Sequence, residues 1–371
     1  MTSTIDARAS AACSKPVPVV NSWTEWGPLE EVLVGTLDGA ACAPWESGMY
    51  ASTPRATVDE VRSYHLANGG SSISNKVKIS AQRELDEFIN ILEGEGVVVR
   101  RPGSIDHSRP ITTPLWTSIG GNANANPRDV LAIMGDEILE APMSWRSRYF
   151  EYMGYRDLIM EYFRAGAKWT AAPKPTMSNR SYNWDYELGT EYVTTENEPL
   201  FDAADMMRCG RDIFIQRSHV TNDTGIEWLR RTYDGRFNFH RVEFQDERAV
   251  HIDATFVALR PGLIMVNPER PVKELPAILR DSDWDLFDGL PSAGSDEEGF
   301  NPAYRWLSMN VLSLDENRVI VEAKEHSLHQ LLEANGLEVI PCPFRNNYRF
   351  GGSFHCATVD IRRRDHCVEL F

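Results

Sequence analysis

Apolar residues recur along the chain with the period of an amphipathic helix, and a short apolar strand follows each such stretch. The first stretch has apolar side chains at i, i+3, i+4 and i+7, namely Leu85, Phe88, Ile89 and Leu92. Two glycines, Gly94 and Gly96, end it, and the β-branched run 97–99 follows. This pattern predicts a helix that buries one face and returns into a strand.

Four further copies of this helix-to-strand pattern follow the first. Their helical apolar sets are Leu158, Ile159, Tyr162 and Phe163; Ile226, Leu229 and Tyr233; Leu275, Ile278 and Leu279; and Leu328, Leu331 and Leu332. The strands that follow are predicted around Trp169, Phe237 and Phe239, Trp284, and Leu337 to Ile340.

Pairs of strands joined by turn residues precede several of these helices. Hairpins are predicted for 130–134 with 138–139, 255–259 with 263–266, and 311–314 with 319–321, and single strands for 29–34 and 212–216. Such repeats indicate quasi-symmetric modules around one axis, with their loops gathered at one end. We therefore expect residues 20–371 to form a single α/β domain, preceded by a flexible tail over residues 1–19. A doubly wound nucleotide-binding sheet is disfavoured, because no GxGxxG follows a strand.

The charge balance argues against nucleic acid as a partner. The chain has 54 acidic and 38 basic residues, a formal net charge of −16, whereas nucleic-acid binders are normally basic. An acidic surface instead attracts small cations. No apolar run reaches the roughly 18 residues of a membrane span, and residues 1–19 lack the apolar core of a secretory signal. We expect a cytoplasmic protein without a membrane partner.

The six cysteines are scattered and form no CxxC pair, so neither a disulfide framework nor a metal site is predicted. Cys356 nevertheless stands out, because it follows Gly351-Gly352, where the backbone can approach a ligand closely. A buried, inert thiol is the more common role for a free cysteine. His355 is a poor partner for Cys356, since neighbours in an extended strand point to opposite faces. It is expected to be a packed histidine with satisfied hydrogen bonds.

His251 is the strongest candidate for a proton carrier. It opens a predicted strand, and Asp253 would lie on the same face of that strand. A structural His–Asp pair and a proton shuttle that titrates near neutrality remain equally open at this point.

Asp202 and Asp129 lie among apolar neighbours, where a carboxylate needs a reason to be. Capping or turn formation is the ordinary reason for a single aspartate. Several carboxylates can also bind one guanidinium, whose planar N–H groups match them bidentately. Grouped around one cysteine and one histidine, they would suit an enzyme that attacks the guanidino carbon.

Beyond these single residues, the chain resembles the L-arginine amidinotransferases from about Val20 to about Arg364. The resemblance is carried by the segments "NANPRDV", "EAPMSWRSRYFEY", "GAKWTAAPKPTM", "FDAADMMRCGRDIF", "HIDATF", "WLSMNVLSLDE" and "GGSFHCATVDIRRR". It implies the pentein fold, a five-fold pseudosymmetric α/β-propeller of ββαβ modules. This agrees with the repeats read from the hydrophobic pattern.

The resemblance also implies roles for individual residues. Cys356 is implied as nucleophile, His251 as general acid and base, and Asp202 as the carboxylate that supports His251 and binds guanidinium. The implied substrate contacts are Asp129, Asp253, Arg270 for the arginine α-carboxylate, and Ser353. The reaction would be a ping-pong transfer from L-arginine through an amidino-cysteine, releasing ornithine, with no metal and no cofactor. A lowered thiol pKa is expected near a bound cation.

Three positions depart from the glycine enzyme of this family as we align it. Tyr304 stands at a serine that contacts the donor, Val250 at a methionine of the acceptor pocket, and Arg248 at a nearby asparagine. Neutral drift is one explanation. The other is that the acceptor is not glycine but an amine bearing an acidic group, such as a precursor in natural-product biosynthesis.

Several alternatives stay open from the sequence. They are a glycine amidinotransferase making guanidinoacetate, an arginine deiminase-like hydrolase releasing citrulline, and a non-catalytic arginine-binding protein. A cysteine protease is disfavoured by the absence of a matching signature around Cys356. Homodimers occur in the family that the chain resembles, and the sequence does not test that state.

Overall fold

The computed structural model describes residues 18–187, 189–297 and 300–371. Most of the tail predicted for residues 1–19 therefore lies outside the described residues. Within them the chain forms five three-stranded sheets. Their strands are β17 (Thr358–Arg363), β1 (Leu29–Val34) and β2 (Val98–Arg100); β5 (Leu131–Met134), β6 (Glu137–Glu140) and β7 (Lys168–Ala171); β8 (Met206–Cys209), β9 (Asp212–Gln216) and β10 (Asn238–Val242); β11 (Phe256–Arg260), β12 (Leu263–Val266) and β13 (Asp285–Asp288); and β14 (Leu312–Ser313), β15 (Arg318–Glu322) and β16 (Glu338–Cys342).

Each of these five three-stranded sheets has the same internal plan. The first strand pairs antiparallel with the middle strand, and the middle strand pairs parallel with the third. A helix makes each parallel crossover, as parallel pairing requires. These helices are α3 (Asn75–Gly94), α5 (Arg156–Arg164), α6 (Asp223–Thr232), α7 (Ala277–Arg280) and α8 (His326–Ala334). The prediction of five ββαβ modules is confirmed.

The first strands of the five modules contact one another in a closed ring. β17 packs beside β5, and β8 beside β11. Arg208 of β8 donates to the carbonyl of Ile133 in β5 at 3.2 Å. Ser313 of β14 donates to the carbonyl of Leu259 in β11 at 3.3 Å, and Arg363 of β17 donates to the carbonyl of Ser313 at 2.9 Å. The ring therefore runs β17, β5, β8, β11, β14 and back to β17.

Strand β17 was not among the predicted strands. It supplies the first strand of the module whose other strands, β1 and β2, lie near the start of the described chain, with Val32 opposite Asp360. The two ends of the chain are thus joined within one sheet, which closes the ring.

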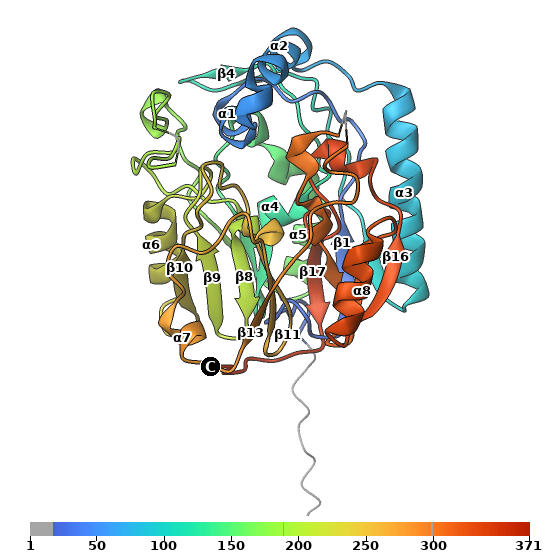
Figure 1. Ribbon diagram of the computed structural model, residues 1–371. Helices are drawn as coiled ribbons and strands as arrows, with labels where there is room; N and C mark the ends of the chain where they lie inside the picture. The colour runs from blue at the N-terminus through green and yellow to red at the C-terminus, as the bar shows by residue number, and fades with distance from the viewer. Residues whose placement is uncertain (1–17, 188, 298–299) are drawn as a thin grey trace, which may run out of the picture.

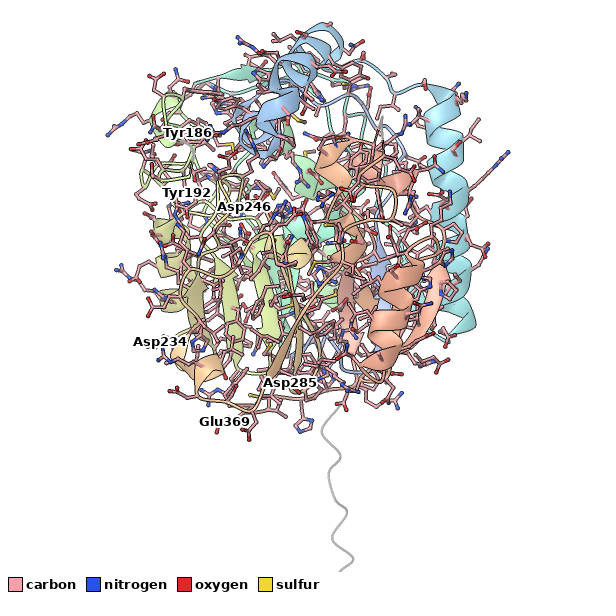
Figure 2. All side chains as sticks on the ribbon, in the orientation of Figure 1. Tyr186, Tyr192, Asp234, Asp246, Asp285 and Glu369 are labelled. Atoms are coloured by element: carbon pink, nitrogen blue, oxygen red, sulfur yellow. The ribbon has the colours of Figure 1, made fainter. Side chains whose placement is uncertain are left out.

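The loops that enter the first strands all lie at one end of the ring. Helix α4 (Pro127–Val130) is on such a loop, and α1 (Ser47–Ser52) and α2 (Val58–Asn68) lie above it in Figure 1. Figure 2 places Tyr186, Tyr192 and Asp246 in the same upper half, and Asp285 and Glu369 at the opposite end. None of the helices in the described ranges combines the length and the apolar character needed to cross a bilayer.

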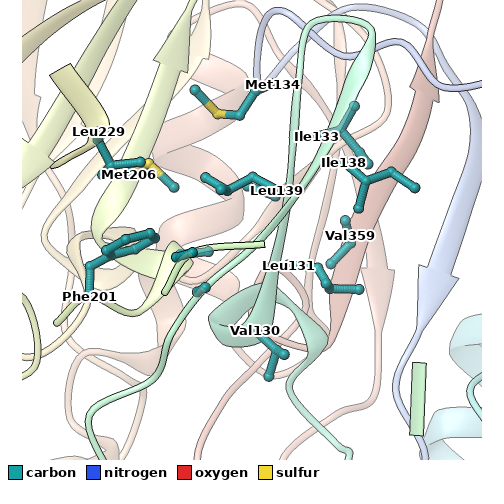
Figure 3. Close-up of a cluster of buried hydrophobic side chains, with 14 of the residues drawn as sticks. Val130, Leu131, Ile133, Met134, Ile138, Leu139, Phe201, Met206, Leu229 and Val359 are labelled. Atoms are coloured by element: carbon teal, nitrogen blue, oxygen red, sulfur yellow. The ribbon is translucent and has the colours of Figure 1, made fainter. Parts of the chain in front are cut away.

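The apolar core lies around the sheets and beneath the helices. One cluster joins the second and third modules through residues that include Leu139, Phe201, Met206 and Leu229 (Figure 3). Leu85, Phe88 and Leu92 of α3 are buried as the helical pattern predicts. The prediction for Phe163 is wrong, because its side chain is 52% exposed and packs edge-on against Trp169.

The axis of the ring is charged rather than apolar. Arg128, Arg208 and Arg363 surround Asp360, and Arg208 also pairs with Glu25. All five side chains are buried. Such an arrangement is tolerated only because every charge has a partner, since an unpaired buried ion is strongly destabilising.

Candidate active site

Five loops, one from each module, bring polar side chains together at one end of the ring. Each loop runs directly into the first strand of its module. The converging residues are Asp129 before β5, Asp202 before β8, His251 and Asp253 before β11, Asn310 before β14, and Cys356 before β17. The repeated module therefore explains why residues far apart in the sequence meet.

Cys356 lies at the end of a glycine-containing turn. Gly351 has φ of 92°, in the left-handed region that glycine adopts without strain. A Cβ on Gly352 would lie 2.4 Å from the Cβ of Cys356, so no larger residue fits there. The expectation that residues 355 and 356 are extended is wrong, because they belong to turns and β17 begins at Thr358.

The thiol of Cys356 is buried, with 3% of the residue exposed. It donates to Oδ2 of Asp253 at 3.2 Å and accepts from Nδ2 of Asn310 at 3.3 Å. Burial raises the pKa of this thiol to about 12, and the carboxylate of Asp253 adds to the effect. Without a ligand the sulfur is therefore held as a neutral thiol.

His251 is held between two carboxylates. Its Nε2 donates to Oδ2 of Asp202 at 3.1 Å, and its Nδ1 faces Oδ1 of Asp129 at 3.5 Å. Burial opposes the charged ring, but Asp129 and Asp202 together raise the pKa of His251 well above its ordinary value. The backbone of His251 has φ of 58°, a strained conformation that non-glycine residues adopt mainly at functional sites. The imidazolium is therefore a fixed proton donor.

The expected pairing of His251 with Asp253 is wrong. Residues Ile252–Ala254 form a 3-10 turn, and β11 begins only at Phe256, so the two side chains do not share the face of a strand. Asp253 instead binds His355 and Cys356 through its Oδ2. His355 is buried and hydrogen-bonded, as predicted for it, although the reason given from an extended strand does not hold.

Three buried carboxyl groups near His251 each keep one oxygen without a hydrogen-bond partner in the described part of the chain. Oδ1 of Asp129, of Asp202 and of Asp205 has no hydrogen-bond partner among the described residues. The other oxygen of Asp129 accepts from Arg148 at 2.7 Å, which fixes the side chain. Unpaired buried acceptors are costly, and a guanidinium with its fan of N–H donors would satisfy them.

Two predicted contact residues, Arg248 and Arg270, lie on loops at this end of the ring. Arg248 points its Nη1 toward the carbonyls of Tyr50 and Ala51 at the end of α1, at 3.4 and 3.5 Å. Arg270 pairs with Asp246 at 3.2 Å and donates to the hydroxyl of Thr255 at 3.3 Å. Asp246 is labelled in Figure 2, in the same half of the molecule as Tyr186.

The remaining predicted substrate-contact residues are Val250, Tyr304 and Ser353. Val250 is half-buried beside His251. The ring of Tyr304 packs edge-on against Tyr348, with centroids 6.0 Å apart. Ser353 is buried and donates its backbone N–H to Oδ1 of Asn310 at 3.2 Å, which ties it to the turn that carries Cys356.

Sequence reasoning missed Asn310 and Arg148. Asn310 contacts both the sulfur and the backbone N–H of Cys356, and Arg148 bridges Asp129 and Glu151. Asn310 directly precedes the predicted strand 311–314, the position from which the other site residues come. That shared position is the signal that could have identified it.

A metal is the alternative reading of the central cluster. One donor atom each from Asp129, His251 and Cys356 lies within 4.8 Å of the others. Asp129 is already paired with Arg148 and His251 with Asp202. A site built from ion-paired groups with a protonated histidine suits a cationic organic ligand better than a metal ion, which requires a neutral imidazole.

A separate groove of about 530 Å³ lies at the other end of the ring, where β17 and β14 finish. Its charged lining is internally paired, with Arg318 on Glu95 and Asp315, and Arg364 on Glu30. It therefore offers no free polar group of the kind found beside Cys356.

The chain is similar over nearly its whole length to known amidinotransferases. It is 43% identical to the mitochondrial glycine amidinotransferase of Xenopus tropicalis, over 99% of this chain and 88% of that protein. It is 44% identical to the L-arginine:L-lysine amidinotransferase of Pseudomonas savastanoi pv. phaseolicola, over 93% of this chain and 94% of that protein. No family model matches the chain.

Solved structures give the same result. The amidinotransferase SxtG of the saxitoxin biosynthetic pathway in Microseira wollei superposes with a TM-score of 0.91 at 44% identity, covering 95% of this chain and 100% of that one. A dimethylarginine dimethylaminohydrolase shares the fold alone, with a TM-score of 0.54 at 12% identity over 89% of this chain and 99% of that one. The architecture is the pentein-type α/β fold.

Proposed function

This chain belongs to the amidinotransferase family, and from that premise we propose that it moves the amidino group of L-arginine to a small primary amine through a covalent adduct on Cys356. The observation that carries the proposal is the convergence of one buried thiol, one imidazolium and a set of carboxylates with free acceptor atoms. A guanidinium bound among these carboxylates stays charged, which keeps its central carbon electrophilic.

The donor half-reaction starts from a bound guanidinium and the imidazolium of His251. The positive charge of bound arginine offsets Asp253 and Asp129, whose carboxylates oppose thiolate formation, so the pKa of Cys356 falls. The thiol releases its proton to solvent, the thiolate attacks the guanidino carbon, and the S–C bond forms. His251 gives its proton to the departing nitrogen, the C–N bond breaks, and ornithine leaves. The amidino group remains on sulfur, which divides one difficult step into two.

The acceptor half-reaction reverses these roles. A primary amine takes the place of ornithine and loses a proton to the now neutral His251. Its nitrogen attacks the amidino carbon, the S–C bond breaks, and the thiolate of Cys356 is regenerated. Asp202 keeps His251 oriented in both half-reactions through its 3.1 Å hydrogen bond to Nε2. Asp129 and Asp253 are the proposed guanidinium contacts, and Arg270 is the proposed partner of the arginine carboxylate.

The proposed acceptor carries an acidic group and is not glycine. Support comes from Arg248, whose side chain is 11% exposed and whose carbonyl contacts, at 3.4 and 3.5 Å, are long for hydrogen bonds. Its nearest carboxylate, Glu247, is 3.6 Å away. A carboxylate or phosphate on the acceptor would pair with it more closely. Val250 beside His251 leaves more room than a methionine would. A precursor in natural-product biosynthesis fits these features.

The proposed location is the cytoplasm. Every cysteine in the described part of the chain is a free thiol, as a reducing compartment would maintain.

The test is mass spectrometry after incubation with guanidino-labelled L-arginine and no acceptor. We expect one amidino group on the peptide that contains Cys356, with one ornithine released per adduct. Cys356→Ser should give neither, whereas Cys342→Ser, which removes another buried thiol, should behave as the unmodified protein does. Citrulline in solution without an adduct would instead indicate an arginine hydrolase. The absence of adduct and product would contradict both reactions.

A further inference from the structure

His355, the residue directly before the proposed nucleophile, has no part in the mechanism above, yet it is bound on both sides. Its ring is buried, with 5% of the residue exposed. Nδ1 lies 2.8 Å from Oδ2 of Asp253, and Nε2 lies 3.2 Å from Oε2 of Glu25. The two ring nitrogens therefore face two different carboxylates.

This geometry determines the charge of the ring. An ionised carboxylate can only accept a hydrogen bond, so a nitrogen that binds one must carry a proton. Burial opposes the ionisation of Glu25, but the fork of Arg208 on it lowers its pKa well below the ordinary value. Burial likewise opposes ionisation of Asp253, and the hydrogen bond from His355 lowers its pKa. With both neighbours anionic, both nitrogens of His355 are donors and the ring is an imidazolium.

The imidazolium acts on the sulfur through one shared atom. Oδ2 of Asp253 accepts from Nδ1 of His355 and also from the thiol of Cys356 at 3.2 Å. If this oxygen lost the cation, it would hold the thiol proton more tightly and repel a thiolate more strongly. If the side chain of Asp253 turned away from Cys356, its other oxygen would also no longer face a bound guanidinium.

We propose that His355 is a positioning residue that, as an imidazolium clamped between Glu25 and Asp253, fixes the carboxylate of Asp253 and offsets its charge so that the Cys356 thiolate can form. The inference rests on the proposed role of Cys356 as nucleophile. The charged groups that face His355 are Asp253, Glu25 and Arg128, whose Nε donates to the backbone carbonyl of His355 at 3.3 Å.

Two substitutions separate the effect of the positive charge of His355 from the effect of its hydrogen bond to Asp253. In His355→Asn the amide nitrogen can replace Nδ1, so the bond to Asp253 is kept while the charge is lost. In His355→Gln the amide nitrogen can replace Nε2, so the bond to Glu25 is kept while both the charge and the bond to Asp253 are lost. His240→Gln is the matched control, because Nε2 of His240 is hydrogen-bonded to Asp212 at 2.7 Å between β10 and β9, away from the site loops.

The readout is the rate of adduct formation from labelled arginine as a function of pH and arginine concentration. For His355→Asn we expect the rate of adduct formation at pH 7 to be at least tenfold slower. The acidic limb of the pH–rate profile should move to a pH about one unit higher, and the half-saturating concentration of arginine should stay within threefold. For His355→Gln we expect the same loss together with a higher half-saturating concentration. His240→Gln should leave all three quantities unchanged. A folded His355→Asn with an unchanged rate and limb would overturn the proposal.

A second measurement needs neither variant of His355 nor activity. In the ¹⁵N-histidine-labelled protein, His355 should keep both ring nitrogens protonated at pH 7, where an ordinary histidine is mostly neutral. Alkylation of Cys356 should shift the ring-nitrogen signals of the histidines near it. The shifted signal that is still present in His251→Gln belongs to His355. A neutral ring at pH 7 overturns the proposal. Doubly protonated nitrogens in a protein that forms no adduct would support the clamp and contradict the proposed function instead.

Discussion

The side-chain amide of Asn310 forms two hydrogen bonds with Cys356. Its Oδ1 accepts the backbone N–H of Cys356 at 3.1 Å, and its Nδ2 donates to the sulfur at 3.3 Å. The same Nδ2 also donates to the carbonyl of Asp253 at 3.2 Å. Asn310 therefore ties the loop before β11 to the loop before β17, and it offers the sulfur a neutral donor among groups that are mostly anionic.

Asn310→Ala should slow adduct formation by roughly 10- to 100-fold. The sulfur becomes negatively charged during attack, and a hydrogen bond to a charged group contributes about 1.5–3 kcal/mol. Rapid quench with labelled arginine measures the rate. Asn335→Ala, which removes a side chain that donates to the carbonyl of Leu331 within a helix end, is the control and should have no effect. Equal rates for both variants would show that the donor is unimportant.

A bound guanidinium should ionise Cys356. Burial and Asp253 raise the pKa of the free thiol to about 12, so the sulfur is protonated at pH 8 when no guanidinium is bound. A cation among the carboxylates favours the thiolate and lowers that pKa. Saturating methylguanidine should therefore raise thiolate absorbance at 240 nm at pH 8, and Cys356→Ser should remove the increase. A thiol that titrates near pH 7 without any ligand would contradict this prediction.

Arg148→Met should destabilise the protein by about 3–5 kcal/mol, because it leaves buried carboxylates without their cation. Arg148 pairs with Asp129 at 2.7 Å and with Glu151 at 2.5 Å. Urea denaturation gives the free energy of unfolding. Arg109→Met removes an arginine that is 82% exposed and pairs with Asp106, and it should cost less than about 1 kcal/mol. Similar losses for the two variants would argue against a special role for Arg148.

Asp205 should make stability fall as the pH rises from about 4 to about 7. Burial raises the pKa of this carboxyl to about 7, while its Oδ2 accepts from Ser218 at 2.6 Å and Thr221 at 2.5 Å. In this interval the unfolded carboxyl has lost its proton and the folded one has not, so the contribution present below pH 4 is lost at up to about 1.4 kcal/mol per pH unit. The free energy of unfolding of Asp205→Asn, relative to the wild type, should therefore increase across this range. A difference that stays constant across this range would contradict the prediction.

Arg248→Ala should weaken the acceptor step more than the donor step. If Arg248 binds the acidic group of the acceptor, its loss should raise the half-saturating concentration of a carboxylate-bearing amine by about tenfold or more, since a charge-assisted hydrogen bond contributes about 1.5–3 kcal/mol. The matched change, Arg55→Ala, removes an exposed arginine that pairs with Glu247 and should have little effect. Steady-state kinetics with carboxylate-bearing and uncharged amines distinguish the cases. Equal effects on both amine classes would rule out Arg248 as the acceptor anchor.

Local signals in the sequence were sufficient for most strands and helices of the modules, although the first strands β8 and β17 of two modules were not predicted. The apolar faces of α3 and α6 are readable because a helix places every third or fourth residue on one side, whatever its distant neighbours are. Strands β1 and β9 were predicted with their observed bounds for the same reason, since a buried strand is a short apolar run between turn residues. Cys356 could be selected by residue type and by the glycines before it, His251 by its place before a predicted strand, and Asp202 by its apolar neighbours.

The pairings within the site were decided only by the tertiary structure. Asp253 was expected beside His251 but binds Cys356, 103 residues away, and His355 binds Glu25, 330 residues away. Contacts between residues this far apart in the chain produce no periodic pattern in the sequence. They follow from the closing of the ring by β17 on β1, which brings the loops of all five modules to one end. The sequence alone thus determined which chemical groups and which repeating module the protein has, because both depend on residues close together in the chain. Which groups touch was decided by ring closure, because contact between distant loops depends on the packing of every module between them.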